Sequence, residues 1–245
     1  MTKSDLERIK EKFATVDSKL YWGDDFDVRF YLISKIKNIS NKKILDLGGG
    51  IGVISGELND SNFRYNLDYS FDYLKKCITR VNRKLNPIMG NMTNIPCKDN
   101  YFDSVISSSV LQYSKSYDLQ KKNIVTVGGI NQYPTVEKVL AEIYRVLAPK
   151  GKLYLVTPNN SYYKSYMLDY NEIKKSFSNH FNNVKIYFYN TFPRLSSRYR
   201  KLNLANTMPK LMTKIYGREK IIQSLIHKDN GVDKYSVSFF VEAEK

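Results

Sequence analysis

The feature that most constrains the fold of this chain is a glycine-rich run, ILDLGGGIG, at residues 44–52. An apolar segment leads into Asp46, and three glycines then alternate with other residues at Gly48, Gly50 and Gly52. A strand, a glycine turn and a following helix bring backbone N–H groups close to a nucleotide-like ligand. Glycine suits such a turn because it has no Cβ to block a positive φ or the ligand's approach. The carboxylate before the turn would repel phosphates and suits a ligand that is cationic at that point.

The glycine spacing excludes two common nucleotide sites. A dinucleotide fingerprint, G-x-G-x-x-G, would need its third glycine at Val53 or Ser55, and a Walker A loop would need Gly-Lys-Ser/Thr. The remaining pattern, D-x-G-x-G-x-G, resembles motif I of the class I S-adenosylmethionine-dependent methyltransferases. A purely structural turn is the alternative.

A second predicted strand, within residues 64–70, ends in Asp68 and is followed by Tyr69. An acid one strand-helix-strand unit beyond the glycines lies where a ribose diol would bind, and a carboxylate accepts from both hydroxyls. The alternative is an acid that favours the dipole at a helix start, with Ser70 as the N-cap.

Residues 88–96 and 102–112 resemble the third and fourth strand ends of the same family. Asn91 stands where an Asp usually contacts the adenine amino group, and an amide oxygen can also accept from that amine. Met92 would pack on the adenine, or serve as ordinary apolar filler. Ser107 and Ser108 end the fourth strand.

Residues 137–159 resemble the family's helix-Pro-Gly-strand segment, so four matching segments span residues 44–159. The nearest subgroup is the type 11-like, ubiquinone/menaquinone-biosynthesis-type methyltransferases. The resemblance implies S-adenosyl-L-methionine as cofactor, and an α/β, Rossmann-like, seven-stranded sheet with helices on both faces and its last two strands antiparallel. The implied cofactor-binding residues are Asp46, Gly48, Gly50, Gly52, Asp68, Tyr69, Asn91, Met92, Ser107 and Ser108.

Hydrophobic patterning predicts the elements of such a sheet. The expected strands lie near 43–47, 64–68, 87–90, 102–107, 151–156, 183–189 and 235–242, and the expected helices near 3–20, 27–39, 51–59, 70–84, 136–147 and 171–179. Alternating strands and helices favour a parallel sheet, whose ligands bind at the carboxyl ends of the strands.

We expect a single domain over residues 1–245, with N-terminal helices at 1–40 forming a lid and a cofactor-binding core at 41–159. Insertions at 114–135 and 190–233 would form the substrate side, the second as a basic cap between the last two strands.

Four residues are candidates for the substrate side. Tyr21 and Trp22 would be lid aromatics, or would pack the N-terminal helices onto the sheet. Gln112 and Tyr113 lie where relatives often carry a His, but neither is a good base near neutral pH. The sequence therefore identifies no catalytic residue.

The formal net charge of +15 is compatible with an anionic partner or with a coding bias toward lysine and asparagine. The basic cap would grip an anionic substrate, lie on a membrane surface, or carry solvated charges or a dimer contact. No apolar run approaches the ~20 residues of a membrane span, and no signal-peptide pattern begins the chain, which favours a cytoplasmic protein. Cys77 and Cys97 match no metal spacing, so no metal site is expected.

The predicted function is S-adenosylmethionine-dependent methyl transfer, by direct displacement, to a small-molecule or lipid/glycan-precursor acceptor. One alternative is an RNA methyltransferase that uses the 190–233 cap, although the N/D-P-P-Y/F tetrad is absent from the fourth strand end. The other is a non-catalytic, cofactor-binding interaction protein.

Overall fold

A computed structural model describes residues 25–81, 85–127, 130–159, 167–189, 226–228 and 238–245. Its helices are α3 (Asp25–Ile36), the 3-10 helix η1 (Ser55–Glu57), α4 (Phe71–Val81), α5 (Gln112–Gln120), α6 (Pro134–Val146) and α8 (Tyr170–His180). Its strands are β1 (Lys43–Leu47), β2 (Phe63–Asp68), β3 (Leu85–Met89), β4 (Phe102–Ser108), β5 (Val125–Val127), β6 (Ile130–Gln132), β7 (Leu147–Pro158), β8 (Asn183–Tyr189), β9 (Ile226–Lys228) and β10 (Ser238–Glu244).

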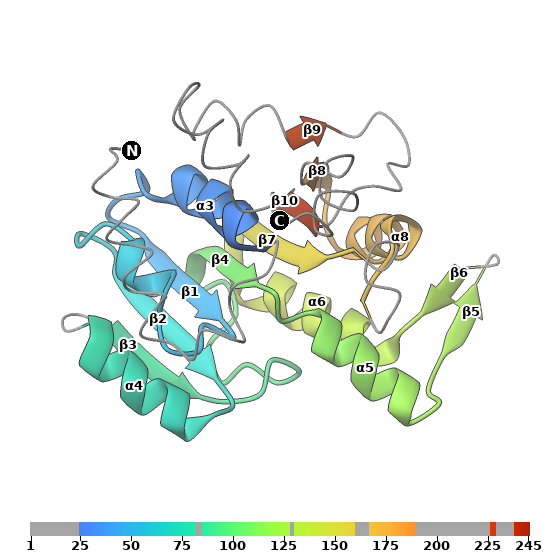
Figure 1. Cartoon of the computed structure of the whole chain (residues 1–245), viewed down its shortest axis with the longest axis horizontal. Coiled ribbons are helices and arrows are strands. Elements are labelled where there is room, and N and C mark those ends of the chain that lie inside the picture. The colour runs from blue at the N-terminus through green and yellow to red at the C-terminus, as the bar shows by residue number, and fades with distance from the viewer. Residues whose placement is uncertain (1–24, 82–84, 128–129, 160–166, 190–225, 229–237) are drawn as a thin grey trace, which may run out of the picture.

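The main sheet has the strand order β3-β2-β1-β4-β7-β10-β8-β9 (Figure 1). The pairs from β3 to β7 are parallel, whereas β10 is antiparallel to both β7 and β8. The predicted seven strands and the antiparallel final pair are confirmed. The short strand β9 adds an eighth, antiparallel to β8 at the edge of the sheet.

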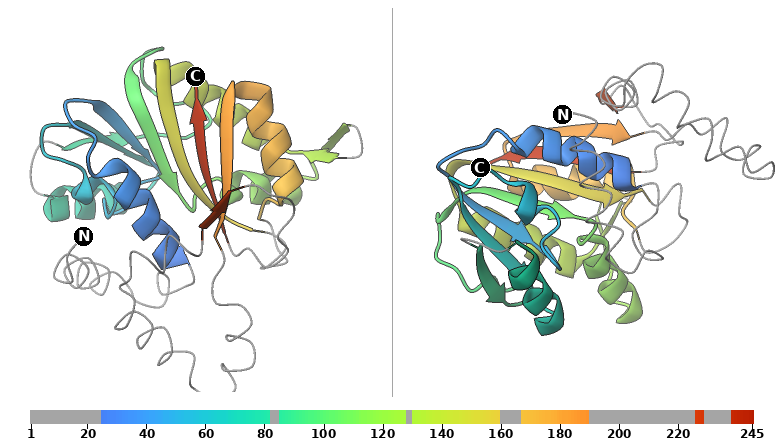
Figure 2. Two further views of the ribbon diagram at one scale, coloured as in Figure 1. Left: turned by 90° about the horizontal axis from the view of Figure 1, so that it is seen from above. Right: turned by 60° about the vertical axis from the view of Figure 1, so that its left-hand side comes forward.

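Helices cover both faces of the sheet, because successive strand residues point to opposite sides (Figure 2). On one face, Leu45 and Val105 join the buried faces of α6 and α8 in a single core. On the other face, Ile44 and Ile106 pack with α3 and the residues around η1. The two-sided layering predicted from the sequence is therefore present.

Among the described residues, the predicted element bounds are close to the observed ones, with one error. The helix expected over 51–59 is wrong, since its only helical residues form the three-residue η1. The expected insertion at 114–135 contains most of α5 and a separate two-stranded hairpin of β5 and β6.

Several predictions fall outside the described residues. These are the helix over 3–20, the candidates Tyr21 and Trp22, and most of the 190–233 cap. Within the part of the chain that the structure describes, no helix is long and apolar enough to cross a membrane.

Candidate functional site

The glycine turn follows β1, and its three predicted glycines do different things. All three have positive φ, namely 68° at Gly48, 53° at Gly50 and 76° at Gly52. A Cβ on Gly48 would lie 2.5 Å from Val110 Cγ2, and one on Gly52 would overlap the Sγ of Cys77. A Cβ on Gly50 would meet nothing closer than 4.0 Å. Packing of the protein itself thus requires two of the glycines, whereas a Cβ on Gly50 would make only ordinary contacts, with Asp68 and Tyr73.

Asp46 lies beneath this turn, with 1% of its surface exposed. Its Oδ2 accepts hydrogen bonds from the Ser55 backbone N–H at 3.1 Å and from the Ser55 hydroxyl at 2.6 Å. Burial raises the pKa of Asp46 to about 6, although the two bonds from Ser55 oppose that shift. The carboxylate therefore holds the turn against η1 and places a buried, titratable negative charge under the glycines.

Asp68, at the end of β2, joins the glycine turn to the start of α4. Its Oδ2 accepts from the Gly50 N–H at 2.9 Å, and its Oδ1 accepts from the Ser70 N–H at 2.8 Å. The Ser70 hydroxyl accepts from the Tyr73 N–H at 3.3 Å, which is the predicted N-cap contact. Both interpretations of Asp68 are thus compatible, because the half-exposed carboxylate sits beside Gly50 and also borders the helix start.

Exposed apolar side chains surround the carboxyl ends of β2 and β3. Tyr69 is 78% exposed and Met89 is 62% exposed, with Tyr73 on the adjoining turn of α4. Large apolar groups seldom gather in water without a partner. The arrangement offers flat, apolar contact surface next to Asp68.

The two candidates on the loop after β3 differ in their surroundings. Asn91 is exposed, and its Oδ1 accepts from the Thr93 N–H at 2.9 Å and the Thr93 hydroxyl at 3.0 Å. Met92 is half-buried against the core and approaches the Ser114 hydroxyl of α5, with 3.9 Å between Sδ and Oγ. Asn91 is therefore held by a local turn, and Met92 connects the loop to α5.

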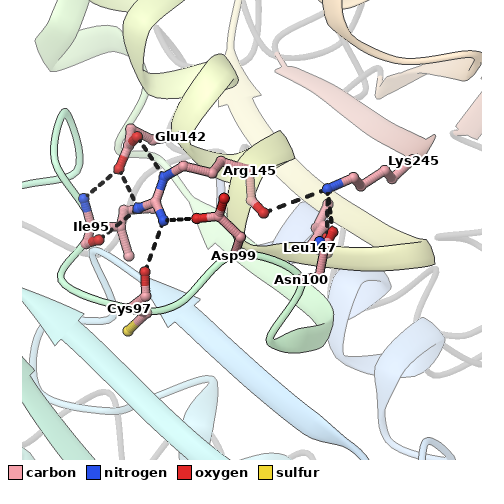
Figure 3. Close-up of polar contacts among 8 residues, drawn as sticks. All are labelled: Ile95, Cys97, Asp99, Asn100, Glu142, Arg145, Leu147 and Lys245. Carbon is pink, nitrogen blue, oxygen red and sulfur yellow. Dashed lines mark hydrogen bonds and ion pairs between the residues drawn. The ribbon is translucent and has the colours of Figure 1, made fainter.

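An arginine on α6 holds the rest of this loop in place (Figure 3). The Arg145 guanidinium donates to the carbonyl oxygens of Ile95 and Cys97, both at 2.8 Å. It also forms ion pairs with Asp99 at 2.6 Å and Glu142 at 2.8 Å, and Glu142 accepts from the Ile95 N–H. One side chain thus fixes the backbone between the Asn91 turn and β4.

The two serines at the end of β4 have separate roles. The Ser107 hydroxyl is buried and donates to the Leu47 carbonyl at 3.1 Å, so it ties β4 to β1. The Ser108 hydroxyl accepts from Arg29 Nε at 3.2 Å, and the Ser109 hydroxyl accepts from an Arg29 Nη at 3.4 Å. Arg29 comes from α3 and was not identified from the sequence, because a contact across 79 residues leaves no local pattern.

Gln112 begins α5 and is 5% exposed. Its Nε2 donates to the Ser109 carbonyl at 2.8 Å, whereas its buried Oε1 accepts no hydrogen bond from the residues that the structure describes. The adjacent Tyr113 is 58% exposed. These two of the four residues predicted for the substrate side therefore lie at the carboxyl end of β4, one buried and one largely exposed.

A buried polar cluster fixes the position of α5. Lys115 Nζ pairs with Glu172 of α8 at 2.6 Å and donates to the Met167 carbonyl at 2.9 Å. Tyr133 donates to the other Glu172 oxygen at 2.9 Å, so every strong charge has a partner. The helix that carries Gln112 is thus locked to α6 and α8.

The site consists of the carboxyl ends of β1, β2 and β4 and the turns after them. Asp46, the glycines and Asp68 lie together around the turn after β1. A second group of hydrogen bonds, after β4, joins Ser108 to Arg29 and Gln112 to the Ser109 carbonyl. Among the described residues, no group of three or more His, Cys, Asp or Glu side chains is arranged to hold a metal ion.

Comparison with known proteins agrees with the fold and with the motifs. Residues 45–155 match a family model described as a methyltransferase domain. An uncharacterized protein of Methanocaldococcus jannaschii is 33% identical over 128 residues, covering 52% of this chain and 46% of the relative. The ubiquinone/menaquinone biosynthesis C-methyltransferase UbiE of Wigglesworthia glossinidia brevipalpis is 30% identical over 125 residues, covering 47% of this chain and 42% of the relative. The chain thus spans less than half the length of either curated relative.

Solved structures of low sequence identity share the fold. Phosphoethanolamine N-methyltransferase 2 of Haemonchus contortus, in complex with S-adenosyl-L-methionine, aligns with a TM-score of 0.55 at 15% identity, covering 91% of this chain and 55% of that one. The N-methyltransferase NodS of Bradyrhizobium japonicum aligns with a TM-score of 0.55 at 10% identity, covering 91% and 98%. At such identities the likeness concerns the fold.

Proposed function

We propose that the chain, whose residues 45–155 match the model of a methyltransferase domain, is a class I S-adenosylmethionine-dependent methyltransferase that transfers the cofactor's methyl group to a small-molecule or lipid/glycan-precursor acceptor. The observation that carries the proposal is the hydrogen bond from the Gly50 N–H to the Asp68 carboxylate at 2.9 Å, at a glycine whose Cβ position lies no closer than 4.0 Å to other protein atoms. The whole of residues 1–245 would act as one catalytic domain.

The residues present fit S-adenosylmethionine. Gly50 leaves room for a ligand where a Cβ would stand, and Asp68 offers carboxylate oxygens to a ribose diol beside it. Tyr69 and Met89 would lie along the adenine, with Asn91 and Met92 beyond them. The negative charge of Asp46, beneath the turn, would attract the positively charged sulfonium. The attraction would act without direct contact, because the Asp46 Oδ2 already accepts a hydrogen bond from Ser55.

The cofactor supplies an electrophilic methyl group, and the protein mainly has to orient the acceptor against it. Asp68 and the glycine turn would hold the cofactor. Gln112 and Tyr113, at the start of α5, would border the acceptor. A glutamine amide and a tyrosine phenol are poor bases at neutral pH. The acceptor would therefore bind in a form that is already nucleophilic, or lose its proton to water.

Two relatives support a small acceptor. The curated relative from Wigglesworthia is named as a C-methyltransferase of ubiquinone/menaquinone biosynthesis, and the Haemonchus structure as a phosphoethanolamine N-methyltransferase. The first name places that relative in the biosynthesis of small lipid-soluble compounds and the second names a small acceptor, which is the class of acceptor that we propose.

Calorimetry with S-adenosylmethionine tests the cofactor site. We expect Asp68→Asn to weaken binding by about 10- to 100-fold, since a hydrogen bond to a charged group contributes about 1.5–3 kcal/mol. Asp72→Asn, an exposed acid in the first turn of α4, is the matched control and should bind like the wild type. Folded wild-type protein that binds no cofactor would contradict the proposal. Labelling of a metabolite extract with methyl-labelled cofactor would then identify the acceptor fraction.

The net charge of +15 favours a second candidate, an RNA methyltransferase. In that case RNA would bind with an affinity that falls steeply as salt increases, and RNA would gain the labelled methyl group. Label that appears only in small molecules would exclude this candidate.

A further inference from the structure

We propose that the end of α5 and the hairpin of β5 and β6 form a surface that docks on an anionic lipid membrane. We call it the hairpin surface, and its members are the exposed residues Tyr117, Leu119, Lys121, Lys122, Ile124 and Val125. The membrane contact itself rests only on these residues and their surroundings. The consequence that docking brings the bilayer to the acceptor rests also on the proposed function.

Large apolar side chains that face solvent are concentrated in two places. Among the described residues, the exposed ones lie either within residues 63–89 or within residues 113–125. The first group borders the proposed cofactor site through Tyr69 and Met89. In the second group the exposed fraction runs from 38% at Leu119 to 58% at Tyr113. Apolar groups that gather on a surface mark a contact with a membrane, a protein or a ligand, so the second group calls for a partner.

Helix α5 and the hairpin direct these side chains outward. Tyr113 and Tyr117 are four residues apart and therefore share a face of α5. After the helix, Lys122 has a φ of 54°, which turns the chain toward β5. Strands β5 and β6 form a separate two-stranded sheet, which projects beyond α5 and α8 (Figures 1 and 2). The hairpin surface is thus presented away from the main sheet.

The charge of the hairpin surface complements an anionic membrane. Lys121 and Lys122 are exposed beside the apolar side chains, and lysines near an anionic bilayer are attracted to its headgroups. The only acid within residues 110–136 is Asp118. It is fully buried, and it accepts from the backbone N–H and the hydroxyl of Thr135 at 2.8 and 2.6 Å. No exposed carboxylate of this segment therefore offsets the two lysines.

The mixture of residues favours a bilayer over a protein partner. Lysine is depleted from protein–protein interfaces, whereas tyrosine and lysine are both common where a protein meets the headgroups of a membrane. The outer edges of a two-stranded hairpin also carry backbone N–H and C=O groups outside its ladder, and these groups need water or headgroups as partners. The hairpin surface would therefore lie at the depth of the headgroups, with Ile124 and Val125 against the first part of the acyl chains.

Docking would bring the bilayer close to the acceptor side of the proposed active site. Helix α5 begins at Gln112 and Tyr113, which border the acceptor in the proposed function, and leads to the hairpin. Its nine residues span about 13 Å. A lipid or lipid-precursor acceptor in the bilayer would thus lie within reach of the carboxyl end of β4.

Sedimentation with vesicles tests the membrane contact on the full chain. We expect the wild type to bind vesicles of phosphatidylcholine and phosphatidylglycerol, and to bind vesicles of phosphatidylcholine alone much more weakly. Lys121→Gln with Lys122→Gln should weaken binding to the anionic vesicles by about 10- to 30-fold. Ile124→Ser with Val125→Ser should weaken it by about 10-fold, because less apolar surface would leave water. Thermal unfolding checks that each variant is folded.

Matched controls lie on α4, which carries an equivalent pair of exposed lysines. Lys75→Gln with Lys76→Gln removes the same charge from the chain. Ile78→Ser replaces an apolar side chain that is 52% exposed but lies outside the hairpin surface. Both controls should bind the anionic vesicles nearly as well as the wild type.

Three outcomes would overturn the membrane contact. The first is a wild type that binds no anionic vesicles. The second is equal weakening by the two lysine-pair variants, since the net charge of +15 would then drive binding from any face. The third is self-association without lipid that the hairpin variants abolish, since the surface would then join copies of this chain.

Calorimetry with S-adenosylmethionine separates this inference from the proposed function. The hairpin variants should bind the cofactor like the wild type, because the substituted residues lie outside the glycine turn and the end of β2. A folded wild type that binds vesicles through the hairpin surface but binds no cofactor would contradict the proposed function and leave the membrane contact intact.

Discussion

At the scale of single residues, Asp46 combines near-complete burial with an ionisable group under the glycine turn. Its pKa is raised to about 6, chiefly by burial. Because this value lies above that of the unfolded chain, the folded state binds the proton more tightly between about pH 4 and pH 6. The contribution of Asp46 to stability therefore falls as pH rises through that window.

The ionised form of Asp46 would be the one that favours a cationic ligand. We expect the affinity for S-adenosylmethionine to increase about tenfold from about pH 5 to pH 7, because the carboxyl group loses its proton over that range. S-adenosylhomocysteine has no sulfonium charge and should show a much smaller change. Calorimetry at several pH values measures both. If the affinities for both ligands changed equally with pH, Asp46 would have no role in recognising the sulfonium charge.

Gly50 and Gly52 provide a second prediction, because both have positive φ but only one is crowded. Alanine at either position costs about 1–2 kcal/mol for the left-handed conformation. Gly52→Ala should lower the free energy of unfolding further, by about 1–3 kcal/mol, because its Cβ would overlap Cys77. Gly50→Ala should instead mainly weaken cofactor binding. Urea unfolding and calorimetry separate the two effects.

The Gly52 prediction has an internal control. Cys77→Ala removes the nearer of the two side chains that the new Cβ would meet, while Val81 Cγ2 would still lie 2.7 Å away, so the double variant should be more stable than the sum of the two single changes predicts. Strict additivity would mean that the contact with Cys77 contributes nothing to the cost of Gly52→Ala.

At the scale of elements, the loop between β3 and β4 depends on α6 through Arg145. We expect Arg145→Lys to speed amide exchange over residues 95–100 and to weaken cofactor binding several-fold, since an ammonium cannot replace the fork of bonds to Ile95, Cys97 and Asp99. Hydrogen-exchange mass spectrometry measures the first effect. Lys98→Met, an exposed change in the same loop, should leave the exchange unaltered. Unchanged protection in Arg145→Lys would show that local turns suffice.

The elements also differ in how well their sequences predict them. The strands of the core and helices α4, α6 and α8 follow apolar periodicity and lie close to their predicted bounds. The helix expected over 51–59 fails because Asp46 takes the backbone N–H of Ser55, and the chain closes into a 3-10 turn. Helix α5 carries no apolar stripe. It buries Gln112, Ser114, Lys115 and Asp118 through specific polar partners, which periodicity does not register.

The residues of the site likewise divide into those that the local sequence predicts and those that only the folded chain reveals. The residues that follow a strand end directly, such as Asp46, Asp68 and Ser108, lie at one edge of the sheet because parallel strands end together. Arg29 reaches Ser108 and Ser109 from α3, a contact between remote segments that only the folded chain brings together. The sequence also did not distinguish Ser107 from the ligand-binding candidates, although its buried hydroxyl donates to the Leu47 carbonyl and joins β4 to β1.

At the scale of the whole molecule, β10 joins the two layers of the core. Phe239 is buried in the core shared with α6 and α8, and Phe240 in the core shared with α3. We expect Phe239→Ala and Phe240→Ala each to lower the free energy of unfolding by about 3–5 kcal/mol. Because one strand serves both layers, both variants should still unfold in a single urea transition, followed by circular dichroism. Two separate transitions in either variant would mean that the layers unfold independently.

The position of β10 also matters for how the protein is made. Among the described strands it is the last in the chain, yet in the sheet it lies between β7 and β8, and it is the strand that pairs with both. While the ribosome is still translating, β7 and β8 therefore each expose an unpaired edge that only a later segment can cover. Such edges are templates for association with other chains. Nascent molecules of this protein should accordingly depend on protection by chaperones until the final strand has emerged.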